Sequence, residues 1–170
     1  MLPIVLEPTA IRIGVAGRGE GLTRRLDLLS KAGIQDVSVF DRGAPSKDEL
    51  ARLAILFIAG LDAGQSRDLA GMARSNGVLV NVEDRADLCD FHVPASVRRG
   101  DLLLTVSTGG QSPGLSRLLR EELESHFGPE WSERLDEIAR SRSDWRAAGV
   151  DPGSVSERTR ALVRDKGWLP

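Results

Sequence analysis

The chain has 170 residues, 41% of them hydrophobic and 28% charged, with a formal net charge of −2, which fits one domain with a small appendage and argues against bulk binding of nucleic acid. Cys89 is the only cysteine, which excludes an internal disulfide framework and a multi-cysteine zinc site. The N-terminal residues carry neither a signal peptide pattern nor an apolar run long enough for a membrane helix, so we expect a protein of the reducing cytoplasm.

Short apolar runs alternate with amphipathic segments along the first two thirds of the chain. The predicted strands cover residues 11–16, 37–40, 54–59, 78–82 and 102–106. The predicted helices cover residues 22–32 and 66–76, and a further helical piece is expected over 87–97. This alternation is typical of an α/β fold, a Rossmann-like parallel sheet with helices on both faces.

The pattern becomes helical after residue 107. Ser112 and Pro113 are a favourable N-cap and first helical residue. An apolar stripe follows at helical spacing, formed by Leu115, Leu118, Leu119, Leu123 and Phe127. Further helical stretches surround Trp131 and Leu162. We therefore predict an α/β domain over residues 1–107 and a small helical C-terminal region over 108–170.

Glycines follow the first predicted strand and open the first helix. Gly17 and Gly19 match the first two glycines of a dinucleotide-binding turn, whereas Leu22 stands at the third small position and Gly21 lies one residue early. Asp41 ends the second strand, where a carboxylate binds the ribose 2′-OH of the adenosine. The pattern favours nucleotide binding over a purely structural glycine turn.

Asp84 comes just after the fourth predicted strand. Ligands of open α/β sheets lie outside the carboxyl ends of the strands, and a carboxylate there can accept or deliver a proton. The alternative is a loop carboxylate that caps a helix, with Glu83, Asp87 and Asp90 as competitors for the catalytic role.

Several other polar residues have simple structural interpretations. Cys89 and His92 do not complete a metal site, so we assign them to packing or to the polar surface. Arg98 and Arg99 before Gly100 are most simply a solvated turn. Thr108 begins a glycine loop before a helix, which suits either an anion or a hinge.

Residues 80–124, VNVEDRADLCDFHVPASVRRGDLLLTVSTGGQSPGLSRLLREELE, resemble without a gap the central signature of the precorrin-2 dehydrogenase/sirohydrochlorin ferrochelatase family. The opening LPI and the turn IGVAGRGE also sit where that family has them. The resemblance implies an NAD-binding Rossmann domain, a dimerisation region and a helical domain. The implied activity is NAD⁺-dependent oxidation of precorrin-2 to sirohydrochlorin, with Fe²⁺ insertion to give siroheme in many members.

The resemblance assigns roles to individual residues. It places the NAD contacts on Gly17, Gly19, Glu20, Gly21, Asp41 and Arg42. Asp84 falls on the family's catalytic aspartate, and Thr108 falls on a serine that is phosphorylated in the fused synthase. A polycarboxylate substrate gives a role to arginines at Arg98, Arg99, Arg117 and Arg120. No permanent metal site is implied, and Fe²⁺ is a substrate.

Three departures touch the nucleotide side of this resemblance. The segment between the second strand and Ala54 is shorter than in the family, Gly60-Leu61 replaces Thr-Asp, and Leu22 replaces a small residue. Our leading interpretation is an NAD-dependent homodimeric precorrin-2 dehydrogenase whose apolar stripe packs on a second copy. The alternatives are a non-catalytic nucleotide- or tetrapyrrole-binding module, and a chelatase that has lost NAD binding. The stripe's own alternative is packing on the chain's α/β domain.

Overall fold

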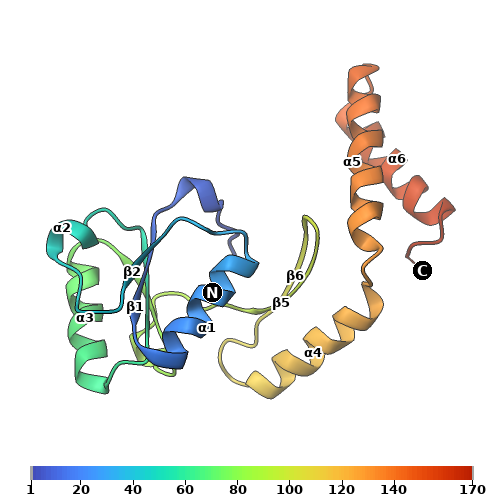
Figure 1. The fold of residues 1–170 in the computed structure, drawn as a ribbon. Helices are drawn as coiled ribbons and strands as arrows, with labels where there is room; N and C mark the ends of the chain where they lie inside the picture. The colour runs from blue at the N-terminus through green and yellow to red at the C-terminus, as the bar shows by residue number, and fades with distance from the viewer. Residues whose placement is uncertain (1, 170) are drawn as a thin grey trace. The chain divides into compact units, whose positions relative to one another are not determined.

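The computed structural model describes residues 2–169 and divides into two compact units, Met1–Val93 and Pro94–Pro170. Figure 1 shows the helices and strands of each unit. No helix of the described residues is both long and apolar enough to cross a membrane.

A four-stranded parallel sheet forms the centre of the N-terminal unit, with the strand order β2-β1-β3-β4. The strands are β1 (Ile13–Gly17), β2 (Val37–Phe40), β3 (Ile55–Ala59) and β4 (Leu79–Val82). The helical elements are η1 (Pro8–Ala10), α1 (Gly19–Lys31), α2 (Lys47–Leu50), α3 (Ala63–Ser75) and η2 (Ala86–Leu88). Every residue of β1 and β3 is buried, as expected for central strands covered on both faces.

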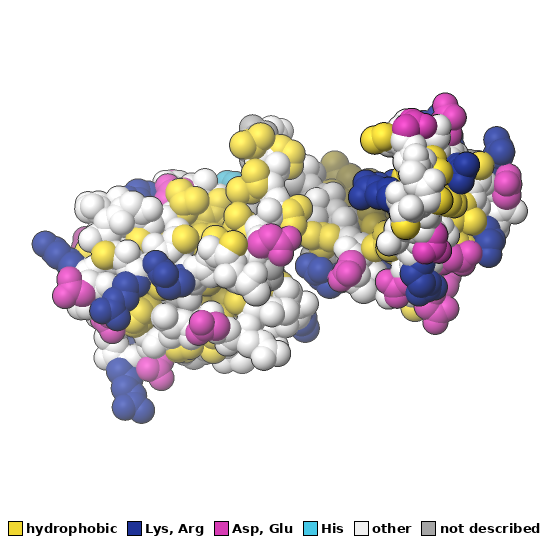
Figure 2. All heavy atoms as spheres, turned by 90° about the horizontal axis from the view of Figure 1, so that it is seen from above, with side chains coloured by type: hydrophobic (Ala, Val, Ile, Leu, Met, Phe, Trp, Pro, Cys, Tyr) yellow, Lys and Arg dark blue, Asp and Glu magenta, His cyan; other side chains and the backbone are white. Residues whose placement is uncertain are grey.

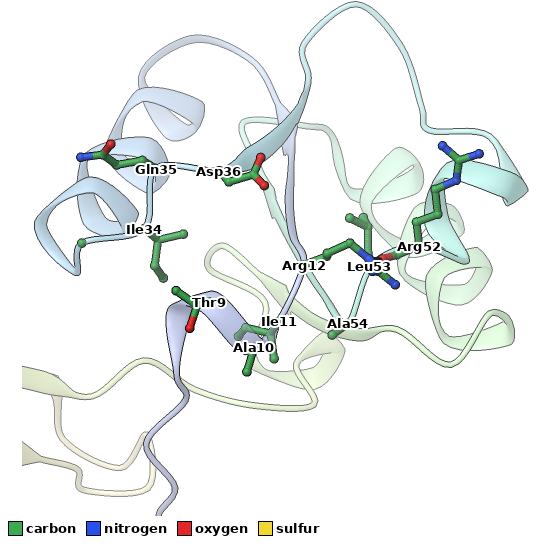
Figure 3. Close-up of a pocket in the computed structure, with 11 residues that line it drawn as sticks. Thr9, Ala10, Ile11, Arg12, Ile34, Gln35, Asp36, Arg52, Leu53 and Ala54 are labelled. Atoms are coloured by element: carbon green, nitrogen blue, oxygen red, sulfur yellow. Dashed lines mark hydrogen bonds between the residues drawn. The ribbon is translucent and has the colours of Figure 1, made fainter.

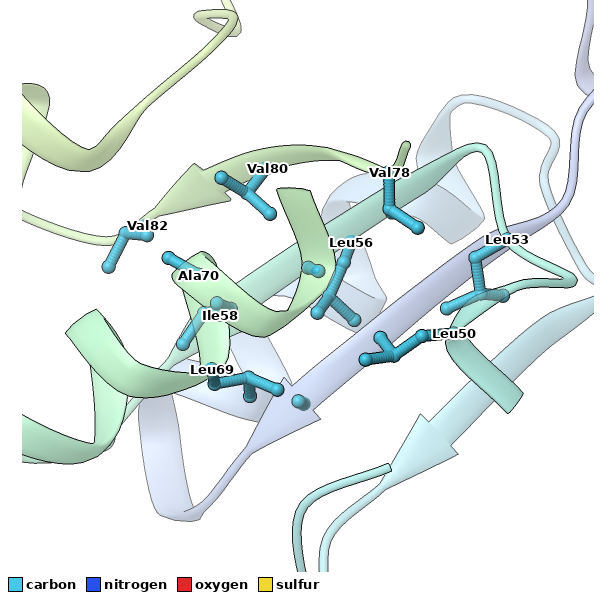
Figure 4. Packing of buried hydrophobic residues seen from close by; sticks show 11 residues of the cluster. Leu50, Leu53, Leu56, Ile58, Leu69, Ala70, Val78, Val80 and Val82 are labelled. Carbon is cyan, nitrogen blue, oxygen red and sulfur yellow. The ribbon is translucent and has the colours of Figure 1, made fainter. Parts of the chain in front are cut away.

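Two apolar clusters cover the two faces of this sheet. On one face Leu56, Ile58 and Val80 pack against Leu50 of α2 and Leu69 of α3 (Figure 4). On the other face a second cluster joins side chains of α1 to the strands; its buried members are Ile13, Val15, Leu29, Ile55 and Phe57. Each helix thus buries its apolar side on the sheet and leaves the strand ends free.

The chain after β4 folds back along the free edge of that strand. The Asp90 carboxylate accepts a hydrogen bond from the Val80 N–H (2.9 Å), and the Asp90 N–H donates to the Val80 carbonyl (2.8 Å). The Cys89 thiol accepts from the Val82 N–H at 3.2 Å. These contacts satisfy backbone groups that an open edge would expose. Cys89 therefore has a structural role, as the sequence suggested, and so does Asp90, which the sequence had offered as a competitor for the catalytic role.

A hairpin and three helices make up the C-terminal unit. Strands β5 (Ala95–Arg99) and β6 (Leu102–Val106) pair antiparallel. Helices α4 (Pro113–His126), α5 (Trp131–Ala147) and α6 (Pro152–Asp165) follow. The hairpin packs on α4, and α5 packs on α6. Ser112 caps α4 as predicted, because its hydroxyl accepts from the Leu115 N–H.

The structure confirms the first four predicted strands, the two predicted helices of the α/β region and the helical character after residue 107. Two predictions are wrong. Residues 102–106 join a separate antiparallel hairpin rather than the parallel sheet, because their partner is the strand at 95–99. That strand occupies part of the helical piece expected over 87–97, of which only η2 is helical. The compact units divide at Val93, ahead of the domain boundary predicted at residue 107, because the hairpin packs with the helices that follow it.

Candidate active site at the carboxyl edge of the parallel sheet

All four parallel strands end at one edge of the sheet, and the residues just beyond them form the candidate site. Gly17 ends β1, Asp41 follows β2, Gly60 follows β3, and Glu83 with Asp84 follows β4. The parallel register therefore brings together the predicted nucleotide turn and the predicted catalytic carboxylate in one unit. This is the edge at which open α/β sheets bind ligands.

The turn between β1 and α1 has the room that a nucleotide needs. Gly19 adopts a φ of 56°, and a Cβ placed on it would meet no atom within 4 Å, so the space above the turn is open. Gly17 lies against the Ala59 carbonyl, which also accepts the Arg18 N–H at 3.2 Å. The residues present thus fit a bound phosphate group at the start of α1. Glu20 lies on the first turn of α1, 94% exposed in its side chain.

Gly21 provides the close packing that the third glycine of the fingerprint usually provides. It is buried, and a Cβ added to it would lie 2.6 Å from Glu83 Oε2 and 2.8 Å from the Gly60 N. Leu22, which departs from the fingerprint, instead packs into the core beneath α1. The shift of one residue therefore keeps the contact between α1 and the strand ends.

A hollow of about 230 Å³ lies beside this turn, and we call it the Asp41 hollow. Its walls come mainly from Ala16, Phe40, Leu61, Leu69 and Met72, with Gly17, Arg18, Asp41, Gly43, Ala44, Gln65 and Asp68 completing it. Asp41 thus lies where the sequence predicted a ribose contact, whereas Arg42 is exposed and does not line the hollow. An apolar cavity with a few polar groups is typical of a small-molecule site.

Asp84 is exposed and has a φ of 56°, the only positive φ of a non-glycine residue between residues 2 and 169. Aspartate tolerates this left-handed conformation better than most residues, but such backbone concentrates at functional sites. Within the described residues its carboxylate makes no hydrogen bond or ion pair, so it is free to act on a ligand.

The three neighbouring carboxylates are already engaged. Glu83 pairs with Arg24, Asp90 accepts from Arg74 at 2.8 Å, and Asp87 pairs with Arg85 at 2.8 Å. The hydrogen bond from Arg85 lowers the pKa of the Asp87 carboxyl and keeps it charged. Of the four acidic candidates in this loop, Asp84 is the one that the structure leaves available.

The predicted substrate residues all belong to the C-terminal unit, and the structure gives most of them a partner. The Arg99 guanidinium donates to the carbonyls of Phe127 (2.8 Å) and Glu124 (3.4 Å), which caps the end of α4. Arg117 pairs with Glu121 at 2.9 Å, and the hydrogen bond raises the pKa of Arg117.

Arg98 and Thr108 complete this set of predicted substrate residues. The Thr108 hydroxyl contacts the Ser112 carbonyl (3.1 Å) and the Ser116 hydroxyl (3.0 Å), which holds the loop before α4. Arg120 pairs with Glu124 at 2.5 Å. Arg98 is exposed, and its guanidinium makes no hydrogen bond or ion pair within residues 2–169. It lies within β5, one residue before that strand ends, rather than in the solvated turn that the sequence suggested.

A larger hollow, of about 610 Å³, opens at the opposite, amino edge of the sheet (Figure 3). Arg12, Asp36 and Arg52 line it, and Arg12 Nε donates to the Arg52 carbonyl. Ligands of parallel α/β sheets bind at the carboxyl ends of strands, so its size does not make it the active site.

The sequence analysis assigned no role at this site to Arg24 or Asp68 and considered Glu83 only as a competitor of Asp84. No local pattern signals the pairing of Glu83 with Arg24, because the two lie 59 residues apart and meet only when α1 packs on the sheet. Asp68, which lines the Asp41 hollow from α3, was missed for the same reason.

Fold and site together define a Rossmann-like α/β protein with a nucleotide-binding turn. The model of a family described as "Putative NAD(P)-binding" matches residues 4–95, and that described as "Sirohaem biosynthesis protein central" matches residues 99–126. The chain therefore belongs to the family described as putative NAD(P)-binding, and the match of its central residues to the sirohaem biosynthesis model agrees with the resemblance seen in its sequence. The two matches meet between β4 and β6, close to the division between the units.

Relatives of known name agree with this assignment. The chain is 33% identical to a siroheme synthase of Nitrosococcus oceani over 92% of its own length and 40% of the relative's. It is 36% identical to that of Methylococcus capsulatus over 75% of its length and 31% of the relative's. The chain thus spans well under half of these synthases.

A solved structure, "SirC, precorrin-2 dehydrogenase", matches with a TM-score of 0.70 at 20% identity, over 99% of this chain and 92% of that one. At this level of identity the match shows the shared fold, and it extends over both units of the chain.

Proposed function

We propose that this chain catalyses the NAD⁺-dependent oxidation of precorrin-2 to sirohydrochlorin. The observation that carries the proposal is Asp84, an exposed and unpaired carboxylate in a left-handed conformation at the sheet edge that also holds the glycine turn. The names of the relatives, siroheme synthase and precorrin-2 dehydrogenase, support the choice of substrate.

The glycine turn and the Asp41 hollow would hold the dinucleotide, with Gly17, Gly19 and Gly21 at the phosphates and Glu20 and Arg42 at the rim. When bound, NAD⁺ supplies a hydride acceptor. Asp41 and Asp68 place two carboxylates in the hollow against the single guanidinium of Arg18. This balance disfavours a 2′-phosphate, so we infer a preference for NAD⁺ over NADP⁺.

Asp84 would act as the base. The oxidation removes a hydride and a proton from the macrocycle, and the proton requires an acceptor at the site. The Asp84 carboxylate accepts it and releases it to solvent, to which the side chain is exposed. The same acceptor would serve Fe²⁺ insertion as a second activity, because the pyrrole protons must leave when the metal ion, a substrate, enters the ring.

The C-terminal unit would contribute substrate contacts and a homodimer interface. Arg98, whose guanidinium is free, is the arginine best placed to bind a substrate carboxylate. Arg99, Arg117, Arg120 and Thr108 support that surface through the contacts described above. Leu115, Leu118 and Leu119 are exposed on α4, and hydrophobic side chains reach the surface of both units in Figure 2. An exposed apolar stripe of this kind is typical of a protein interface.

The direct test is anaerobic incubation of the purified chain with precorrin-2 and NAD⁺. We expect NADH absorbance to grow together with the spectrum of sirohydrochlorin, and Fe²⁺ added afterwards to give the siroheme spectrum. NAD⁺ binding without NADH formation would instead support the non-catalytic binding module.

A further inference from the structure

Glu83 is a half-buried carboxylate between the glycine turn and Asp84, and the proposed reaction gives it no role. We propose that Glu83, paired with Arg24, is a positioning residue that joins the start of α1 to the end of β4, so that nucleotide binding and the placement of Asp84 depend on one ion pair. The link to Asp84 rests on the function proposed above, whereas the link to the nucleotide turn does not.

The ion pair spans two elements that are distant in the sequence. Arg24 Nη2 lies 3.3 Å and Nε lies 3.4 Å from Glu83 Oε1, and Arg24 Nη1 lies 3.4 Å from Glu20 Oε2. The Glu83 side chain is only 17% exposed, whereas that of Glu20 is 94% exposed. Solvent screens the outer pair more than the inner one, so the Glu83–Arg24 contact is the stronger of the two.

The second oxygen of Glu83 lies against the nucleotide turn. Glu83 Oε2 occupies the space beside Gly21, where an added Cβ would come within 2.6 Å of it. Gly21 is in the first turn of α1, the positive end of the helix dipole, which favours a carboxylate at this place. A movement of Glu83 would therefore change the packing of the turn that receives the nucleotide.

The backbone of Glu83 is fixed on the sheet side. Its N–H donates to the Ile58 carbonyl at 2.9 Å, which continues the β3–β4 ladder by one residue. The chain then enters the left-handed conformation of Asp84, and the Arg85 N–H donates back to the Val82 carbonyl at 3.4 Å. A residue in a sparsely populated conformation keeps it only when its surroundings hold it. Glu83 fixes the residue before Asp84 through its backbone, and its side chain connects that residue to α1.

A double-mutant cycle tests the pair. We expect Glu83→Gln and Arg24→Gln each to weaken NAD⁺ binding and to lower kcat by about tenfold, and the double variant to be no worse than either single one, because residues of one ion pair are non-additive. Glu83→Asp, which keeps the charge, should retain part of the activity. Asp87→Asn, which breaks an exposed pair in the same loop, is the control and should change neither quantity.

The measurements are NAD⁺ affinity by calorimetric titration, kcat and KM with precorrin-2, and thermal unfolding of each variant. Arg24 is 60% exposed, so Arg24→Gln should unfold at the temperature of the unmodified chain and report on the site alone. Unchanged NAD⁺ affinity in both single variants, or losses that simply add in the double variant, would overturn the proposal.

The titration also separates this inference from the proposed function. If the losses of NAD⁺ affinity are non-additive but the chain does not oxidise precorrin-2, the ion-pair coupling is supported and the dehydrogenase activity is contradicted. If the chain oxidises precorrin-2 but the losses of NAD⁺ affinity are additive, the dehydrogenase activity is supported and the coupling is contradicted.

Discussion

The two units of the chain bury their apolar residues very differently. The N-terminal unit encloses whole strands between two helical layers, so Val15, Leu56 and Ile58 have essentially no exposed surface. In the described part of the C-terminal unit only Val97, Trp131 and Val155 are buried among the hydrophobic side chains, while Leu118 is 64% exposed. Both units expose apolar side chains, such as Leu2 and Val5 in the first and Leu118 in the second, but only the N-terminal unit also encloses an extensive buried core.

The two units also differ in which of their charged side chains have a partner. In the loop after β4, three paired carboxylates surround Asp84, whose own carboxylate has no partner among the described residues. In the C-terminal unit most of the predicted substrate arginines are held by carbonyls or glutamates, and Arg98 is the exception. This difference is the basis for proposing catalysis at the N-terminal unit, and assembly with a share of substrate binding at the C-terminal unit.

The largest expected effect is at Asp84. Asp84→Asn keeps the size of the side chain but removes the proton acceptor, and a positioned base contributes roughly 10²–10⁴-fold. We expect kcat for precorrin-2 oxidation to fall by about that factor while NAD⁺ affinity is unchanged. Any Fe²⁺ insertion should fall as well.

Asp87→Asn is the matched control, because it removes a carboxylate from the same loop that is already paired with Arg85. It should keep most of the activity. Normal oxidation by Asp84→Asn would contradict the role of Asp84 as the base and would show that the proton acceptor lies elsewhere.

The next effect concerns assembly through the C-terminal unit. Leu118→Glu places a charge in the exposed apolar stripe of α4, and burying it unpaired is costly, so we expect the dimer to dissociate at least tenfold more readily. Sedimentation equilibrium at micromolar concentration measures this. Gln35→Glu adds the same charge to an exposed loop of the N-terminal unit and should leave the dimer intact. A monomeric unmodified chain would contradict the dimer itself.

The sequence predicted the parallel sheet well because its strands are mainly apolar runs, and the central strand β3 is an uninterrupted one followed by Gly60. It failed at Ala95–Arg99, a short strand in which Ala95 and Val97 alternate with Ser96 and Arg98, and it therefore also missed the partner of residues 102–106. Asp84 was predictable from its place after an apolar run. The Glu83–Arg24 pair was not, because it joins residues distant in the sequence.

Two adjacent arginines of β5 are expected to have different roles, Arg98 in substrate binding and Arg99 in stability. Arg98→Ala should raise KM for precorrin-2 several-fold and leave KM for NAD⁺ unchanged, and the effect should shrink as salt screens the lost contact. Arg99→Ala should instead lower the unfolding temperature, because two carbonyls at the end of α4 lose their donor. Equal changes in KM for the two variants would show that Arg99 binds substrate despite its carbonyl contacts.

Asp41 tests the nucleotide preference within the N-terminal unit. Asp41→Ala removes one of two carboxylates from the hollow and leaves Arg18 in place. We expect the affinity for NAD⁺ relative to that for NADP⁺ to fall by a few fold. Asp68 should preserve part of the preference for NAD⁺. Isothermal titration with both nucleotides measures the ratio. Equal affinities in the unmodified chain would contradict the role of both carboxylates.

The smallest effect is a pH-dependent one at the start of α6. Hydrogen bonds from the side chain and backbone N–H of Ser154 lower the pKa of the Asp151 carboxyl, which caps this helix. A carboxyl whose pKa is lower in the folded state stabilises the fold above its unfolded pKa, and this contribution disappears as the pH falls through the folded value. Asp151→Ala should therefore lower the unfolding temperature of the C-terminal unit slightly at neutral pH and converge with the unmodified chain below about pH 4. Asp136→Ala, an exposed position within α5, should show no such convergence. If the difference in unfolding temperature between Asp151→Ala and the unmodified chain stays the same in acid, the charged form of the Asp151 carboxyl contributes nothing to the stability of α6.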